Sequence, residues 1–90
     1  MVKVLVVEDN PLNMELILEI LQSRDFVVDT VDDGEKAITI TDKSPYDLIL
    51  MDIALPGMDG VEATRIIKNK LNYKNVPVVA LTAFAMARDR

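Results

Sequence analysis

Four polar side chains directly follow apolar, strand-like runs of the sequence: Glu8, Asp9, Asp52 and Thr82. If these runs are parallel strands of one sheet, their carboxyl ends meet at the edge where open α/β sheets bind their ligands. Carboxylates that converge there repel one another, and a hard divalent cation relieves that repulsion. Because the chain contains neither histidine nor cysteine, its ligands are oxygen atoms only, which favours Mg²⁺, Mn²⁺ or Ca²⁺ over zinc.

A cation beside Asp52 would give this carboxylate a definite chemistry. It would neutralise the charge of an incoming phosphoryl group and leave Asp52 free to attack the phosphorus, so the product would be an acyl phosphate. The hydroxyl of Thr82 could then donate a hydrogen bond to a phosphoryl oxygen. Glu8 and Asp9 alone would be interpreted as solvated loop charges, and their combination with Asp52 and Thr82 is what favours a site. Asp59 is instead predicted to cap a helix.

Four apolar runs predict the strands that position these side chains. Residues 48–51 form a continuous apolar run bounded by turn signals, which is typical of a parallel strand buried on both faces. Residues 3–7 are apolar after Lys3 and rich in β-branched side chains, as in a central strand. Further strands are predicted at residues 26–31 and 76–81, and Pro77 lies near the start of the last one, where a lost hydrogen-bond donor is tolerated.

Helices are predicted between the strands. Asn10 offers an N-cap and Pro11 suits the first helical position, so one helix covers about residues 11–24. This helix is apolar over more than one stripe and therefore needs a partner beyond the sheet. A second helix, after an aspartate cap, covers about residues 35–43.

The third predicted helix begins at a pattern that resembles a capping box, from Asp59 to Glu62. Its apolar face is predicted from helical spacing to comprise Val61, Ile66, Ile67 and Leu71. Residues 84–90 could open another helix. Strands that alternate with helices imply parallel pairing and right-handed crossovers, so the sequence predicts an α/β fold with an open, doubly wound parallel sheet.

Length and charge restrict the function further. Ninety residues allow one small domain. The net charge of −5 opposes binding to nucleic acid or to an anionic membrane surface. No segment has the pattern of a signal peptide or the length of a membrane span. We therefore expect a soluble, cytoplasmic protein with no direct nucleic-acid or membrane partner.

Four stretches together resemble the receiver domain of bacterial two-component response regulators: VLVVEDN at residues 4–10, DLILMD at 47–52, LPGMDG at 55–60 and PVVALTA at 77–83. They occur in the order and spacing of that family. The resemblance implies a flavodoxin-like sheet with the site where the first and third strands lie side by side. It also implies a sensor histidine kinase or a histidine phosphotransfer protein as phosphoryl donor, and a downstream protein as target.

The resemblance assigns a role to each candidate residue. Asp52 would be the phosphoacceptor, Asp9 a direct Mg²⁺ ligand and Glu8 a ligand through water. The backbone carbonyl of Ala54 would be a further ligand, and Thr82 would be the switch hydroxyl. Mn²⁺ or Ca²⁺ could replace Mg²⁺ at such a site.

The chain also departs from the family pattern. Receiver domains continue beyond Ala83 through a complete fourth helix, a fifth strand that ends in an essential lysine, and a fifth helix. We therefore expect residues 1–90 to be a C-terminally incomplete receiver with strand order 2-1-3-4. The fourth strand would then be an exposed edge, which predicts self-association through that strand.

Two other functions remain open at this point. A domain without the family lysine could be an interaction module that is never phosphorylated. A phosphohydrolase of the haloacid dehalogenase type also uses an aspartate nucleophile after a parallel strand, but that class expects a second acid two residues later. Because this position is Ala54, the enzyme is the less favoured alternative, and we expect a protein that is not an enzyme.

Overall fold

The computed structural model describes residues 1–55 and 57–81. Its centre is a parallel sheet of four strands in the order β2-β1-β3-β4, as the family resemblance implied. The strands are β1 (Lys3–Val7), β2 (Val27–Val31), β3 (Leu48–Asp52) and β4 (Val78–Leu81). The helices are α1 (Pro11–Gln22), α2 (Gly34–Lys43) and α3 (Gly60–Lys68), followed by the 3₁₀-helix η1 (Leu71–Tyr73).

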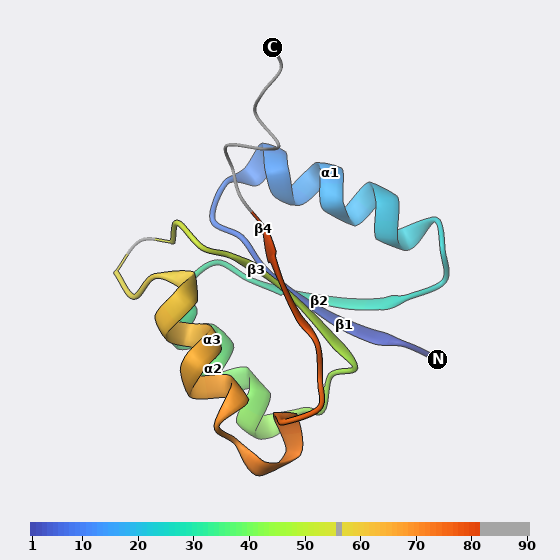
Figure 1. Cartoon of the computed structure of the whole chain (residues 1–90). Helices are drawn as coiled ribbons and strands as arrows, with labels where there is room; N and C mark the ends of the chain where they lie inside the picture. The colour runs from blue at the N-terminus through green and yellow to red at the C-terminus, as the bar shows by residue number, and fades with distance from the viewer. Residues whose placement is uncertain (56, 82–90) are drawn as a thin grey trace.

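Helices cover both faces of the sheet: α1 lies on one face, and α2 and α3 lie on the other (Figure 1). Side chains of β1 alternate between the two layers because successive residues of a strand point to opposite faces. Leu5 and Val7 belong to the core beneath α2 and α3, whereas Val4 and Val6 pack with Ile17 of α1. Burial of this central strand on both faces follows from the uninterrupted apolar sequence of its residues 4–7.

The predicted element boundaries are correct to within a few residues. The first helix ends at Gln22 rather than near residue 24: Ser23 is its C-cap, and the positive φ of 64° at Asp25 excludes any continuation of the helix through that residue. Strand β4 begins after Pro77, whose carbonyl accepts a hydrogen bond from the Ile49 amide at 3.1 Å. The further helix expected at residues 84–90 lies outside the described residues.

The predicted apolar face of the third helix was wrong in part. Val61 and Leu71 are 63% and 84% exposed, and Leu71 lies beyond the end of α3. The side of α3 that meets the core instead carries smaller residues, Gly60 and Ala63, followed by Ile67. Counting large apolar side chains failed here because the helix begins so close to the sheet that only small residues fit.

The approach of α3 to the end of β3 requires glycine at position 60. A Cβ atom on Gly60 would lie 2.1 Å from the carbonyl oxygen of Asp52 and 2.6 Å from Cα of Ile53. The Gly60 amide also donates a hydrogen bond to the Ile53 carbonyl at 3.1 Å. Gly60 thus connects the start of α3 to the backbone that carries Asp52.

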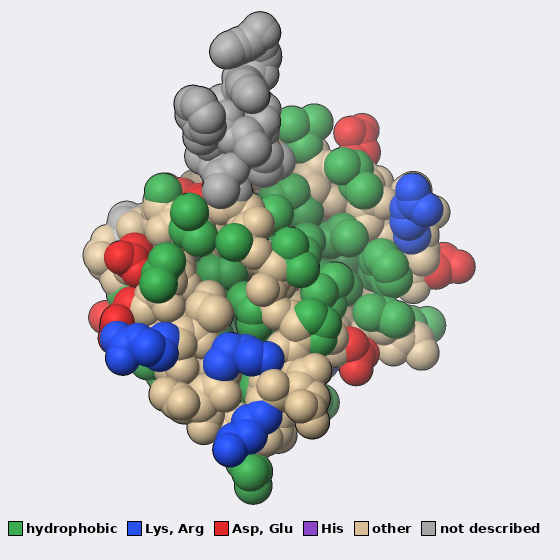
Figure 2. All heavy atoms as spheres, viewed as in Figure 1, with side chains coloured by type: hydrophobic (Ala, Val, Ile, Leu, Met, Phe, Trp, Pro, Cys, Tyr) green, Lys and Arg blue, Asp and Glu red, His purple; other side chains and the backbone are tan. Residues whose placement is uncertain are grey.

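Apolar side chains remain exposed on one side of the molecule. Leu12, Leu16 and Ile20 form a row along α1 and are 70%, 50% and 60% exposed. Val79 of β4 is also exposed. Figure 2 shows apolar side chains gathered over this side. The sheet therefore leaves part of the apolar surface of α1 uncovered, and the partner expected for this helix stays a prediction.

We predict that Gly60→Ala destabilises the domain by about 3 kcal/mol, because its methyl group would overlap backbone atoms of β3 that cannot move independently. The free energy of unfolding in urea measures this effect. Gly57→Ala is the matched control: Gly57 has a φ of 73° but open space around its missing Cβ, so it should cost only about 1 kcal/mol. Equal losses in the two variants would contradict the close-packing explanation.

Candidate metal and phosphoacceptor site

The carboxyl ends of β1 and β3 bring the predicted acidic residues together. These strands are neighbours, and Val7 pairs with Met51 in their register. Glu8 follows Val7 and Asp52 follows Met51, so these two acids lie side by side, and Asp9 follows Glu8. One carboxylate oxygen from each of Glu8, Asp9 and Asp52 lies within 4.8 Å of the others. The convergence expected from the sequence is therefore present.

Burial makes this cluster electrostatically unfavourable without a cation. Glu8 and Asp52 are 2% and 1% exposed, whereas Asp9 is exposed. Burial raises the pKa of the Glu8 carboxyl above its ordinary value, and the negative charge of Asp52 raises that pKa further. Hydrogen bonds from Asn10 and Asn13 oppose this rise in the pKa.

The two oxygens of Glu8 have different surroundings. Oε2 accepts a hydrogen bond from the Asn10 amide at 3.1 Å and one from Asn13 Nδ2 at 3.5 Å. Oε1 is buried and has no hydrogen-bond partner in the part of the chain that the structure describes. A buried acceptor without a partner is costly, and a cation or its bound water would satisfy it.

Asp52 is held by the loop that follows it. Its Oδ1 accepts a hydrogen bond from the backbone amide of Ala54 at 3.0 Å. Ala54, the predicted carbonyl ligand, is thus the residue whose backbone already contacts Asp52. Oxygen donors, crowded negative charge and the unpaired Glu8 Oε1 together fit a hard divalent cation, which Glu8, Asp9 and Asp52 would hold.

The predicted switch residue, Thr82, lies outside the described residues. The residue before it, Leu81, pairs with Asp52 in the register of β3 and β4. The Leu81 carbonyl also accepts a hydrogen bond from the Ile53 amide at 3.2 Å. The end of β4 therefore reaches the level of Asp52, and the role of Thr82 stays a prediction.

Asp59 serves as the helix cap that the sequence predicted. Its Oδ1 accepts a hydrogen bond from the Glu62 amide at 2.8 Å. Glu62 does not complete a capping box, because its carboxylate pairs with Arg65. Asp59 thus holds the start of α3, which adjoins the end of β3, and the metal cluster of the described residues does not include it.

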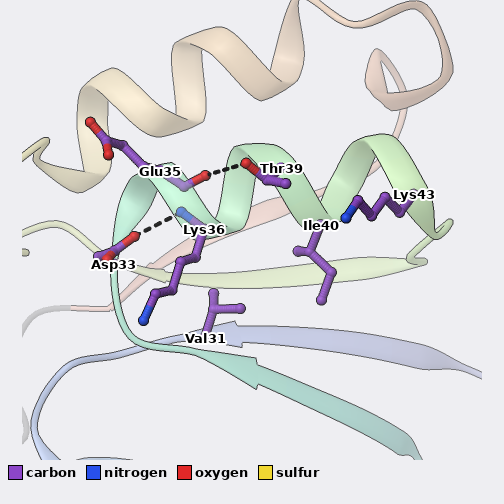
Figure 3. A pocket seen from close by; sticks show the side chains of 7 residues that line it. All are labelled: Val31, Asp33, Glu35, Lys36, Thr39, Ile40 and Lys43. Atoms are coloured by element: carbon purple, nitrogen blue, oxygen red, sulfur yellow. Dashed lines mark hydrogen bonds between the residues drawn. The ribbon is translucent and has the colours of Figure 1, made fainter.

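A pocket of about 630 Å³ lies elsewhere, along α2. Figure 3 shows Val31 and Ile40 beside it, with Lys36 and Lys43 at its sides. Its lining shares no residue with the acidic cluster. Several of its polar groups are engaged locally: Asp33 Oδ1 caps α2 by accepting from the Lys36 amide at 2.7 Å. Lys36 Nζ binds Asp32 at 2.8 Å. This pocket offers no convergent set of groups for a reaction.

The contacts of two residues with the site, Asn13 and Gly60, were not predicted from the sequence. Asn13 contacts Glu8 from the first turn of α1, and its signal was a polar side chain within a strongly apolar helix. Gly60 approaches the backbone of Asp52, and its signal was a glycine at the first position of a capped helix. Neither signal states by itself what the residue contacts.

Within residues 1–55 and 57–81, no helix combines the length and apolar character needed to cross a membrane. The longest helix among these residues, α1, contains 12 residues. A bilayer core requires about 20 residues of helix.

Comparison with known proteins gives a consistent result. Residues 4–90 match the model of the response regulator receiver domain. The chain is 40% identical over 91 residues to the sensor protein GacS of Pseudomonas syringae pv. syringae. The match covers 98% of this chain and 10% of GacS. The chain thus spans about a tenth of the length of that curated relative.

Solved structures of similar fold include a receiver domain and a response regulator protein. The receiver domain of the sensor histidine kinase PA1611 from Pseudomonas aeruginosa PAO1 has a TM-score of 0.87 and 44% identity, covering 98% of this chain and 72% of that one. That structure has a magnesium ion coordinated in its active-site cleft. The response regulator protein TrrA of Thermotoga maritima, solved in complex with the histidine kinase ThkA, has a TM-score of 0.84 and 36% identity, and the match covers 100% of this chain and 76% of that one.

Apart from Lys3, the family match includes the four described strands of the sheet, and it includes the three clustered carboxylates. The strand order that the resemblance implied is the order observed. The chain belongs to the response regulator receiver domain family.

Proposed function

We propose that this receiver is a phosphoacceptor module of a two-component system or phosphorelay. Asp52 accepts a phosphoryl group from a sensor histidine kinase or a histidine phosphotransfer protein, and Mg²⁺ is required. The observation that carries the proposal is the cluster of Glu8, Asp9 and Asp52 at the ends of β1 and β3. The magnesium ion in the PA1611 receiver and the complex of TrrA with a histidine kinase support it by similarity.

The surroundings of Asp52 suggest how the transfer proceeds. Because Oδ1 accepts from the Ala54 amide, we assign the attack on phosphorus to Oδ2. An O–P bond forms, the P–N bond of the donor phosphohistidine breaks, and the imidazole nitrogen keeps the electron pair. The product is an acyl phosphate on Asp52. Bound Mg²⁺ would supply the positive charge that offsets the repulsion between the Asp52 carboxylate and the phosphoryl group.

The remaining site residues have supporting parts in this proposal. Asp9 is a direct Mg²⁺ ligand, Glu8 is a ligand through water, and the Ala54 carbonyl is a further ligand. Thr82 is the switch hydroxyl that would bond the phosphoryl group. Added charge at Asp52 shifts a conformational equilibrium that a downstream protein recognises. The domain would therefore act as a signalling module rather than as an enzyme.

We also propose self-association through β4, which is the end strand of the sheet within the described residues. Val79 and Ala80 are exposed there. Antiparallel pairing of this edge with the same edge of a second copy would join two sheets about a twofold axis.

Asp52 phosphorylation is tested by intact mass after incubation with acetyl phosphate and Mg²⁺. We predict the addition of one phosphoryl group in the wild type, and none in Asp52→Asn or in the presence of EDTA. Asp59→Asn is the matched control, since asparagine also caps helices, and it should be phosphorylated normally. A folded wild type that gains no mass, or an Asp52→Asn variant that gains the same mass, would refute the proposal.

Removing the charge of Glu8 should stabilise the metal-free domain and reduce the further stabilisation that metal provides. We predict that Glu8→Gln stabilises the metal-free domain by about 1 kcal/mol, because it relieves repulsion within the buried cluster. In Mg²⁺, the variant should gain less stability than the wild type, since it binds the ion more weakly. Urea unfolding in EDTA and in Mg²⁺ measures both effects. A metal-free variant less stable than the wild type would show that the Glu8 charge does not destabilise the metal-free domain.

Self-association predicts an average mass that rises with concentration in light scattering. Val79→Lys, which places a charge on the β4 edge, should shift the population toward monomer. Val61→Lys is the control, because Val61 is also an exposed valine but lies on α3. A compact monomer over a wide concentration range would rule out this part of the proposal.

A further inference from the structure

Asn13 is placed to act on the metal site without touching a metal. Its Nδ2 donates to Oε2 of Glu8 at 3.5 Å, and the Asn10 amide donates to the same oxygen at 3.1 Å. Both donors therefore engage one carboxylate oxygen. The other oxygen, Oε1, is buried without a hydrogen-bond partner among the described residues.

The start of α1 fixes where Asn13 lies. Asn10 caps this helix: its Oδ1 accepts from the Leu12 amide at 2.9 Å and from the Asn13 amide at 3.2 Å. The backbone of Asn13 is thus tied to the loop that carries the acidic pair. Its side chain is partly buried and extends back toward Glu8. The cap and the Glu8 contact belong to one connected set of hydrogen bonds.

We infer that Asn13 is a positioning residue: together with the Asn10 amide, it holds Oε2 of Glu8 and leaves Oε1 as the oxygen offered to a divalent cation or its bound water. This inference rests on the proposed function, because it assigns Glu8 to the metal site. The orientation of ligands by outer hydrogen bonds is a general feature of metal sites.

The chemistry of the amide suits this task. A lysine at position 13 would neutralise Glu8 and compete with the cation, whereas the neutral amide donates a hydrogen bond and adds no charge. An aspartate there would bring further negative charge into a cluster that already contains three carboxylates. An asparagine fixes the rotamer of Glu8 and leaves the charge of the cluster available to the metal.

Mn²⁺ affinity, measured by calorimetric titration of the whole chain, tests the inference directly. We expect Asn13→Ala to weaken Mn²⁺ binding by about tenfold. Asn13→Ser, whose hydroxyl is too short to reach Glu8, should behave similarly, and Asn13→Gln should restore part of the affinity. Asn72→Ala is the matched control, because Asn72 is exposed in η1, and it should bind Mn²⁺ like the wild type.

A double-mutant cycle separates positioning from a general loss of structure. If Asn13 acts through Glu8, Asn13→Ala should have little further effect on Mn²⁺ affinity in a Glu8→Gln background. An unchanged affinity in folded Asn13→Ala, or an equal loss in both backgrounds, would overturn the inference. A wild type that binds no Mn²⁺ would overturn the proposed function itself, so the two failures are distinguishable.

Discussion

The confinement of three carboxylates at the end of a parallel sheet is the constraint on which this structure depends. Two of them, Glu8 and Asp52, are almost completely buried. Repulsion between charges is stronger in such surroundings than in water. The arrangement is therefore stable only because the rest of the fold supports it, and it favours any ligand that brings positive charge.

The support comes from elements on both faces of the sheet. Alternating apolar residues of β1 pack against α1 on one side and against α2 and α3 on the other, which fixes the strand that ends in Glu8. Gly60 lets α3 contact the backbone of Asp52, and Asn10 ties the start of α1 to the acidic loop. Large parts of the core thus serve to hold two strand ends in register.

Much of this could be predicted from the sequence, because buried parallel strands are uniformly apolar and end where the polar residues begin. The pattern located Glu8, Asp9 and Asp52 at one sheet edge and Asp59 as a helix cap. It failed for α3, where close packing selects small residues, and for Asn13, whose contact depends on a side-chain rotamer. Periodicity records which residues are apolar, but it does not record distances between elements.

Anomalous diffraction from crystals of this chain soaked in Mn²⁺ would locate a bound cation without reference to any activity. We expect one strong peak among the carboxylates of Glu8, Asp9 and Asp52, lost when Asp52 is replaced by asparagine. A fully ordered cluster with no peak, or a peak only at other acidic side chains, would contradict a cation as the counterpart of this buried charge.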